Sequence, residues 1–177
     1  FDIKSLRYFG KNIQTITQKN IQGVNIYHVE LQTEKNYNKN EYIFKYDLNG
    51  KYVISTSENK NKNTESEYAL VKFTLDKKRV NNKPIYIYGE LTNWDTIPEA
   101  KMMYNEKNKS YYGFLYLKQG YYNYQYVSRD SKNKIYFIDS NHQETRNEYS
   151  VYVYHRPIWQ DYDRLIGLGK NTSNALN

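Results

Sequence analysis

Short runs of alternating apolar and polar residues, separated by Gly, Asn and Pro, follow one another along most of this chain. The clearest run covers residues 68–75, YALVKFTL, in which the odd-numbered positions are the apolar ones: Ala69, Val71, Phe73 and Leu75. Successive side chains of a strand point to opposite faces, so these four predict a face turned toward a core. Residues 25–31 show the same alternation, with Tyr27, Val29 and Leu31 on one side.

Extended to the whole chain, this pattern predicts strands at residues 4–9, 13–18, 26–31, 42–47, 52–55, 68–75, 84–89, 111–117, 120–127, 135–138 and 149–154. The best hairpin signal is Asn49-Gly50, a pair that tolerates positive φ. Residues 98–103 predict no more than one helical turn. Many short strands without a convincing helix predict an all-β protein built from two β-sandwich units.

The polar stretch 58–66, ENKNKNTES, contains no apolar residue and suits a linker or an exposed loop. It places a domain boundary between an N-terminal β unit at 1–62 and a β-sandwich at 63–160. Residues 161–177 are expected to be a C-terminal tail or linker. The chain starts at Phe1 rather than Met, which predicts an N-terminal unit truncated at its start.

Composition narrows the class of protein. Tyrosine accounts for 22 of the 177 residues, so rings with a polar tip supplement a hydrophobic fraction of only 38%. The net charge of +7 is scattered rather than clustered, and nucleic-acid binding is not expected. Without cysteine, disulfides and thiolate sites are excluded. No apolar run approaches the roughly 20 residues that span a membrane, so no membrane insertion is expected.

Motifs of enzymes are missing from the sequence: there is no GxSxG, HExxH, phosphate loop or GxGxxG. We therefore predict no catalytic residue, no metal site and no cofactor. Two alternatives stay open, namely a metal cluster of the dispersed histidines and a pair of catalytic carboxylates. The metal cluster would consist of His28, His142 and His155. The catalytic pair would come from Asp95, Glu99, Asp139 and Glu144. In the Asp161-Tyr162-Asp163 segment, a salt bridge to Arg156 or Arg164 is favoured over cation binding.

Trp94 follows the strand predicted at 84–89 and is the most informative single residue. An aromatic side chain on a loop between strands can stack on a sugar ring or anchor a protein interface. It can equally cap the core of a sandwich. The sequence leaves these roles open.

The segment GELTNW, the hairpin at 111–127 and the closing segment at 144–154 resemble early-set immunoglobulin-like domains of the glycogen-binding kind, including that of AMP-activated protein kinase. The resemblance covers residues 81–156. It implies an α-glucan site whose residues, by position, are Trp94, Tyr136, Gln125, Thr145 and Asn147. Gln125 stands where that family has a lysine, and Tyr136 is only an approximate counterpart of its second tryptophan.

A second resemblance runs through the whole chain. The segments FDIKSLRYFG, YDLNGKYVI, SEYALVKFTL, YIYGELTNW, LKQGYYNYQYV, ETRNEYSVYVYHRP and YDRLIG, in this order, are similar to the type IX secretion system plug protein family of Bacteroidota, formerly a domain of unknown function. It implies a protein exported to the periplasm, with its signal peptide outside this sequence. Its partner would be the outer-membrane translocon protein of the type IX system.

Together, these observations predict a non-enzymatic periplasmic plug or accessory component of the type IX translocon, acting through protein-protein contacts. The alternative is a carbohydrate-binding module that recognises an α-glucan oligosaccharide through Trp94 and its polar neighbours.

Overall fold

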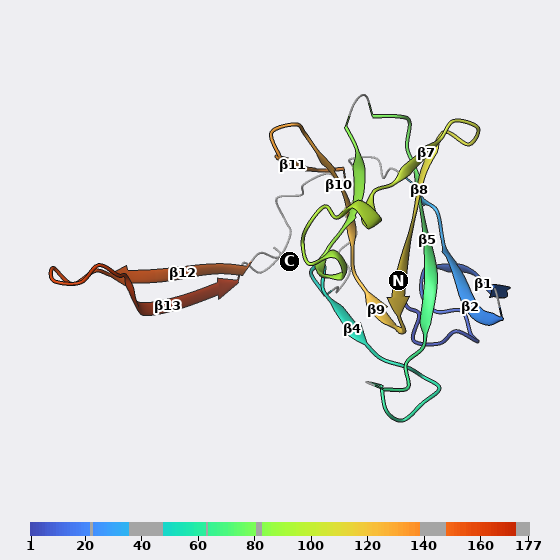
Figure 1. Cartoon of the computed structure of the whole chain (residues 1–177), viewed down its shortest axis with the longest axis horizontal. Coiled ribbons are helices and arrows are strands. Elements are labelled where there is room, and N and C mark those ends of the chain that lie inside the picture. Colours follow the sequence, from blue (N-terminus) through green and yellow to red (C-terminus); the bar gives the residue numbers. More distant parts are fainter. Residues whose placement is uncertain (22, 36–47, 63, 81–82, 139–147, 173–177) are drawn as a thin grey trace. The chain divides into compact units, whose positions relative to one another are not determined.

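The structure is a computed structural model that describes residues 1–21, 23–35, 48–62, 64–80, 83–138 and 148–172. The chain divides into two compact units, Phe1–Ser140 and Asn141–Asn177. Its described residues form thirteen β-strands and two short 3-10 helices, with no α-helix among them (Figure 1). The all-β class predicted from the sequence is therefore confirmed.

The largest sheet of the first unit has six strands, in the order β1-β2-β5-β8-β7 with β3 also paired to β5. These strands are β1 (Ile13–Ile21), β2 (Val24–Leu31), β3 (Glu34–Lys35), β5 (Tyr68–Asp76), β7 (Met103–Asn105) and β8 (Ser110–Lys118). Strands β2 and β3 run parallel to β5, and the other pairs are antiparallel. A hairpin from the start of the chain thus extends a sheet whose centre comes much later in the sequence.

Two smaller sheets complete the first unit. One has the order β11-β10-β6 and the other pairs β4 with β9. Their strands are β4 (Tyr52–Ile54), β6 (Ile85–Tyr88), β9 (Gly120–Tyr122), β10 (Gln125–Arg129) and β11 (Ile135–Phe137). The 3-10 turn at Pro98–Ala100 lies where one helical turn was predicted.

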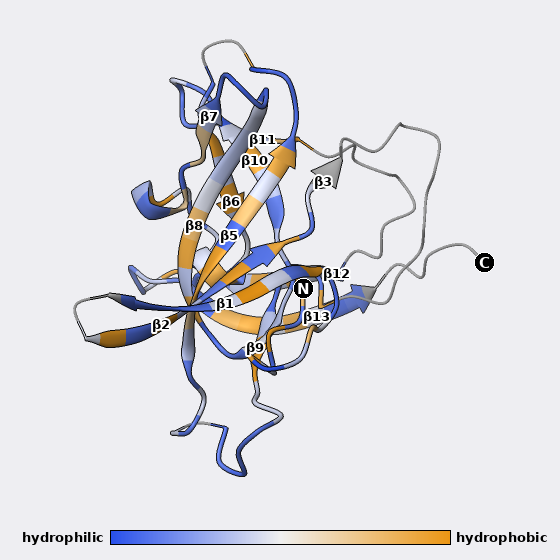
Figure 2. Cartoon of the chain, turned by 90° about the vertical axis from the view of Figure 1, so that its right-hand side faces the viewer, coloured by the Kyte–Doolittle hydropathy of each residue, from blue (hydrophilic) through white to orange (hydrophobic). Residues whose placement is uncertain are grey.

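The core follows the alternation seen in the sequence. Ala69, Val71 and Phe73 of β5 are fully buried, and Leu75 is almost so. Figure 2 shows hydrophobic residues recurring along β5, which lies between β2 and β8. Val29 and Leu31 of β2 are buried as predicted, because β2 pairs with β5 and presents the same face to the core.

The boundary predicted between residues 62 and 63 lies inside the first unit. Residues on its two sides share one sheet, since Tyr27 to Glu30 of β2 pair with Ala69 to Lys72 of β5. They also share one cluster of buried residues, to which Ile13 contributes from the early segment and Phe73 from the later one.

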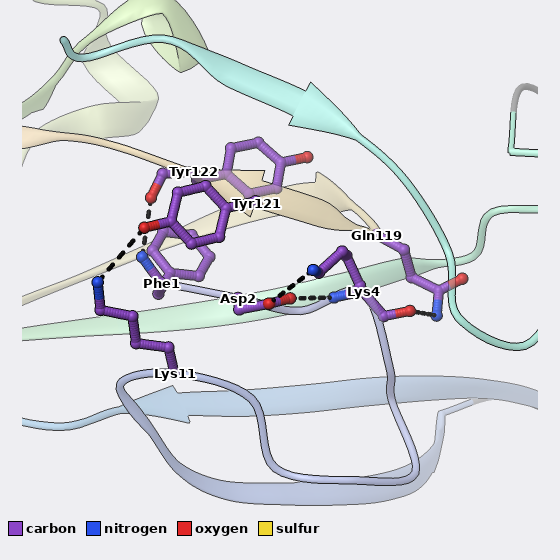
Figure 3. Close-up of polar contacts among 7 residues, drawn as sticks. All are labelled: Phe1, Asp2, Lys4, Lys11, Gln119, Tyr121 and Tyr122. Atoms are coloured by element: carbon purple, nitrogen blue, oxygen red, sulfur yellow. Dashed lines mark hydrogen bonds and ion pairs between the residues drawn. The ribbon is translucent and has the colours of Figure 1, made fainter. Parts of the chain in front are cut away.

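The first residues do not form the strand predicted at 4–9, and the chain bends there instead. Its opening residues pair with the segment around β9. The Phe1 ammonium donates to the Tyr122 carbonyl at 2.8 Å, and the Ile3 amide donates to the Gly120 carbonyl at 2.8 Å. Phe1 also stacks on the Tyr122 ring, with centroids 5.2 Å apart (Figure 3). Within the predicted range, the Lys4 amide donates to Asp2 Oδ1 and the Arg7 and Tyr8 amides donate to Ser5 Oγ, so these groups bond locally rather than to a neighbouring strand.

Gln119, which lies between the two strands predicted at 111–117 and 120–127, is fully buried. Its side-chain Nε2 donates to the Lys4 carbonyl at 3.1 Å (Figure 3). The same Nε2 donates to Glu58 Oε2 at 2.6 Å, and the side-chain Oε1 accepts from the Glu67 amide at 2.9 Å. The amide of one side chain thus joins three separate segments. The strand predicted at 120–127 is correspondingly interrupted, ending as β9 at Tyr122 and resuming as β10 at Gln125.

The second unit contains one antiparallel pair, β12 (Glu148–His155) and β13 (Arg164–Thr172). Residues 164–172, expected to belong to a tail or linker, form β13 instead. The salt bridge favoured by the sequence is present, with Arg156 Nε donating to Asp163 Oδ1 at 2.8 Å. Among the described residues, no helix has the length and apolarity needed to cross a membrane.

Candidate functional site

Trp94 sits on a turn whose backbone shape is unusual. The 3-10 turn Glu90–Thr92 follows β6, and both Asn93 and Trp94 then take positive φ values, 53° and 57°. The Trp94 amide donates to the Gly89 carbonyl at 2.9 Å, and the buried Thr92 hydroxyl donates to the same carbonyl at 3.1 Å. Such left-handed residues without glycine persist only where hydrogen bonds over-determine them. The turn therefore holds the indole in one place.

The indole of Trp94 is half-buried rather than wholly packed or wholly open. Its Cη2 atom would lie 2.5 Å from a Cβ at position 50, so the ring rests on the backbone of Gly50. It meets the Tyr88 ring edge to face, with centroids 5.8 Å apart. With these contacts in place, 41% of the surface of Trp94 remains exposed to solvent. Trp94 is thus both a cap over the Asn49-Gly50 turn and an accessible aromatic surface.

One face of the β11-β10-β6 sheet continues this surface. Directly opposed residues of antiparallel strands share a face, and Tyr88 pairs with Gln125 while Val127 pairs with both Tyr86 and Phe137. The Tyr88 and Phe137 rings lie 6.3 Å apart, and Phe137 is 44% exposed. We call the set formed by Trp94, Tyr86, Tyr88, Gln125 and Phe137 the aromatic face.

Of the residues predicted from the sequence, Trp94 and Gln125 belong to this aromatic face and Tyr136 does not. Tyr136 pairs with Ser128, which puts it on the opposite side of the sheet from Phe137. Its hydroxyl donates to Asp130 Oδ2 at 2.9 Å, and Lys83 Nζ lies 4.2 Å from the ring centroid. The hydrogen bond to Asp130 raises the pKa of Tyr136. Thr145 and Asn147 lie outside the described residues.

Tyr86, Tyr88 and Phe137 are the members of the face that were not predicted from the sequence. The signal was present in part, because Tyr86 and Tyr88 alternate with buried Ile85 and Ile87. The sequence did not show that the register between β10 and β11 places Phe137, rather than Tyr136, on the same face of the sheet as Tyr88.

Polar groups border the aromatic face. Arg129, two residues beyond Val127 on β10, donates from Nη1 to Thr96 Oγ1 at 2.5 Å and lies 3.9 Å from Asp95 Oδ1. Its buried Nε has no hydrogen-bond partner in the described part of the chain. Stacking rings beside a guanidinium can receive a planar or apolar group together with an acceptor.

A separate pocket of about 570 Å³ is lined by Arg79, Val80, Lys83, Pro84, Ile85, Lys101, Met102, Tyr104 and Tyr111. Its positive charge is partly engaged already: Arg79 pairs with Glu106 at 2.6 Å and lies over the Tyr104 ring. The Tyr111 hydroxyl accepts from the Val80 amide at 2.7 Å. This pocket offers weak attraction for an anion but no acid-base pair.

No group of three or more His, Asp or Glu residues in the described ranges is placed to hold a metal ion. His28 lies on β2 and His155 on β12, in different units. Of the four carboxylates considered for catalysis, Asp95 lies beside Arg129, while Asp139 falls among the residues that are not described. Glu144 falls there too, as does His142.

Comparison with known proteins identifies a relative of known structure. No family model and no curated protein matches the sequence. A hypothetical protein from Parabacteroides merdae ATCC 43184, known from a crystal structure, matches with a TM-score of 0.86 and 34% identity. The match covers 97% of this chain and 43% of that chain, so this chain spans less than half of that protein's length. The chain thus shares its β-rich fold with a Bacteroidetes protein whose function is not named.

Proposed function

We propose that this chain is part of a non-enzymatic periplasmic plug or accessory component of the type IX protein secretion translocon. Its partner would be the outer-membrane translocon protein, met through protein-protein contacts. Two lines of support agree: the ordered sequence motifs of the plug protein family, and the structural match to a Bacteroidetes protein.

The observation that carries the proposal is the aromatic face. Trp94 and Phe137 are 41% and 44% exposed, yet they are held by a hydrogen-bonded turn and by sheet pairing. Rigid aromatic side chains bury much area on binding and lose little entropy, which suits a surface that meets a large protein rim. The arrangement provides contact area and specificity without a nucleophile or a paired acid and base.

We further propose that the strands from β5 to β11 form an early-set immunoglobulin-like β-sandwich, as the resemblance around GELTNW implies. The supporting observation is that buried residues of two separate sheets join one cluster. Phe73 and Leu115 come from the larger sheet, and Ile87 and Tyr126 from the β11-β10-β6 sheet.

Co-purification tests the proposed function. The intact protein, tagged in a bacterium that has a type IX system, should isolate the translocon barrel from solubilised membranes. Trp94→Ala should reduce recovery of the barrel at least about fivefold, since truncating a central aromatic anchor commonly costs more than about 1 kcal/mol. Tyr8→Ala is the control, because Tyr8 is a 76% exposed aromatic residue of the opening segment and is not a member of the aromatic face. Failure of the unaltered protein to recover the barrel would refute the proposal.

A carbohydrate-binding module is the second candidate, and one observation favours it: Trp94 and Gln125 lie on the same face. A sugar ring stacked on Trp94 would change its fluorescence. The sequence has two tryptophans, so the titration with maltooligosaccharides uses a Trp159→Phe background in which Trp94 is the only fluorophore of its kind. A saturable change that Gln125→Ala weakens would support sugar binding, and a flat titration would remove this candidate.

A further inference from the structure

The pocket of about 570 Å³, lined by residues of β6, β7 and β8 and of the segments beside them, has walls that are tied to one another. The Met102 amide donates to the Ile85 carbonyl at 2.8 Å, and the Val80 amide donates to the Tyr111 hydroxyl at 2.7 Å. Tyr104 pairs with Tyr111 across β7 and β8, and their rings meet edge to face with centroids 4.8 Å apart. Sites for small molecules are usually preformed and measure about 300 to 1,000 Å³. This pocket can therefore receive a small ligand without rearrangement of its walls.

The charged side chains that line the pocket all carry the same sign. They are Arg79, Lys83 and Lys101, and no carboxylate from the described residues joins them. Two are partly engaged, because Arg79 pairs with Glu106 at 2.6 Å and Lys83 Nζ lies 4.2 Å from the Tyr136 ring centroid. The exposed side chain of Lys101 makes no hydrogen bond or ion pair within the part of the chain that the structure describes. Its ammonium is therefore available to an anion in the pocket.

The inner wall of the pocket combines a hydroxyl donor with apolar side chains. The Tyr111 hydroxyl accepts from the Val80 amide, and none of the described residues accepts the proton of this hydroxyl. Tyr111 is buried, and a buried tyrosine hydroxyl usually finds a partner for its proton. Ile85 is fully buried and Met102 almost so, and both belong to the same lining. An oxygen atom attached to an apolar group would satisfy both features of this wall.

Attraction between an anion and an exposed lysine is weak in water, so binding here needs apolar contact as well. We propose that the pocket binds a small aromatic oxyanion, namely a carboxylate or phosphate carried by a single ring. The oxyanion contacts Lys101 Nζ and accepts from the Tyr111 hydroxyl. Its ring packs on Ile85, Met102 and Tyr104, where contact between rings adds to the burial of apolar area. This inference does not rest on the proposed function, because the pocket and the aromatic face share no residue.

Titrations followed by NMR on the isotope-labelled chain test the proposal. Phenyl phosphate and phenylacetate each carry an oxyanion on a ring, whereas inorganic phosphate and acetate lack the ring and benzyl alcohol lacks the charge. At least one aromatic anion should shift the amide signals of the lining residues saturably, with a Kd of about 5 mM or lower. It should also bind at least about tenfold more tightly than its ring-free anion and than benzyl alcohol. A smaller advantage over either, or no saturable shift with either aromatic anion, would overturn the proposal.

Matched substitutions locate the bound anion. Lys101→Gln should weaken the better aromatic anion at least about fivefold, because a hydrogen bond to a charged group is lost. Lys107→Gln makes the same change of charge at an exposed lysine outside the lining and should leave the Kd within about twofold. Tyr111→Phe should also weaken binding at least about fivefold, whereas Tyr112→Phe, at the next residue of β8 and outside the lining, should not.

Two results of these substitutions would contradict the proposed site. Equal weakening by Lys101→Gln and Lys107→Gln would overturn it, because the net charge of the protein rather than the pocket would then attract the anion. A Kd that neither Lys101→Gln nor Tyr111→Phe changes would overturn it as well. Lys101 is exposed, so its substitution should leave the fold intact and keeps the test decisive even if Tyr111→Phe lowers stability.

Discussion

Gly50→Ala should displace the indole of Trp94 and lower the stability of the protein. The loss of stability has two contributions, one from the backbone of residue 50 and one from the packing of Trp94. Gly50 has a φ of +78°, so any side chain there adopts the left-handed conformation at a cost of about 1 to 2 kcal/mol. The new methyl would also sit 2.5 Å from Trp94 Cη2 and 3.0 Å from Cζ3, which is closer than these atoms can approach. The indole must move, because the backbone of Gly50 is itself held through its carbonyl by the Glu90 amide at 2.9 Å.

Displacing the indole adds a second cost. Trp94 would lose its edge-to-face contact with Tyr88, worth about 0.5 to 1.5 kcal/mol, and repacking a crowded site commonly costs about 1 to 3 kcal/mol. Gly23→Ala is the matched control: Gly23 has a φ of +82°, but a Cβ there meets nothing within 4 Å. We therefore expect Gly50→Ala to destabilise the protein by at least about 1 kcal/mol more than Gly23→Ala. For a chain of this length that is about 2 to 4 °C in melting temperature.

The assay combines thermal unfolding with fluorescence in the Trp159→Phe background. Gly50→Ala should shift the emission of Trp94 toward longer wavelengths, because the ring gains contact with water, and Gly23→Ala should leave it unchanged. If both alanine variants lose the same stability and Trp94 emission stays constant in both, the packing of Trp94 on Gly50 is refuted.

Three further predictions concern the core and the pH dependence of stability. Phe73→Ala should lower the free energy of unfolding, measured by chemical denaturation, by about 3 to 5 kcal/mol, because Phe73 is fully buried against Phe1 and Tyr124. Phe114→Ala on the neighbouring strand should lower it by less than about 1 kcal/mol. Gln119→Leu should cost about 1 to 3 kcal/mol, because it leaves the Glu67 amide without its partner and removes one of the hydrogen bonds that the Lys4 carbonyl and Glu58 accept. Burial raises the pKa of Glu58, but hydrogen bonds from Ser5, Gln119 and Thr56 outweigh burial and hold that pKa below its usual 4.5. The stability of the protein should therefore fall as the pH drops below about 4.5. Glu58→Gln should make this dependence of stability on pH less steep.

Each of these predictions has a contradicting result. Equal losses for Phe73→Ala and Phe114→Ala would mean that β5 does not face the core. For Gln119→Leu, a stability within about 0.5 kcal/mol of the parent would show that the amide does not join the three segments. For Glu58, an unchanged slope of stability against pH between about 3 and 4.5 in the Gln variant would contradict the lowered pKa.

The aromatic face shows which part of the candidate site could be predicted from the sequence. Trp94 was singled out because a tryptophan after a strand, next to Gly and Asn, stands out without any structure. Its partner was misplaced by one residue: Tyr136 was named, but Phe137 shares the face with Trp94. Side chains alternate with a period of two, so a difference of one residue in pairing exchanges the two faces of a strand. That pairing depends on β10, which is distant in sequence from Trp94.

By itself, the sequence determined the all-β class, the positions of most described strands and the buried faces of β2 and β5, because alternation and turn residues act over a few neighbouring positions. Only the tertiary structure decided that β2 runs parallel to β5, that Gln119 is buried as a junction, and that Arg164–Thr172 forms a strand. These outcomes depend on which distant segments meet, since hydrogen bonds across a sheet stabilise a strand that local composition does not predict.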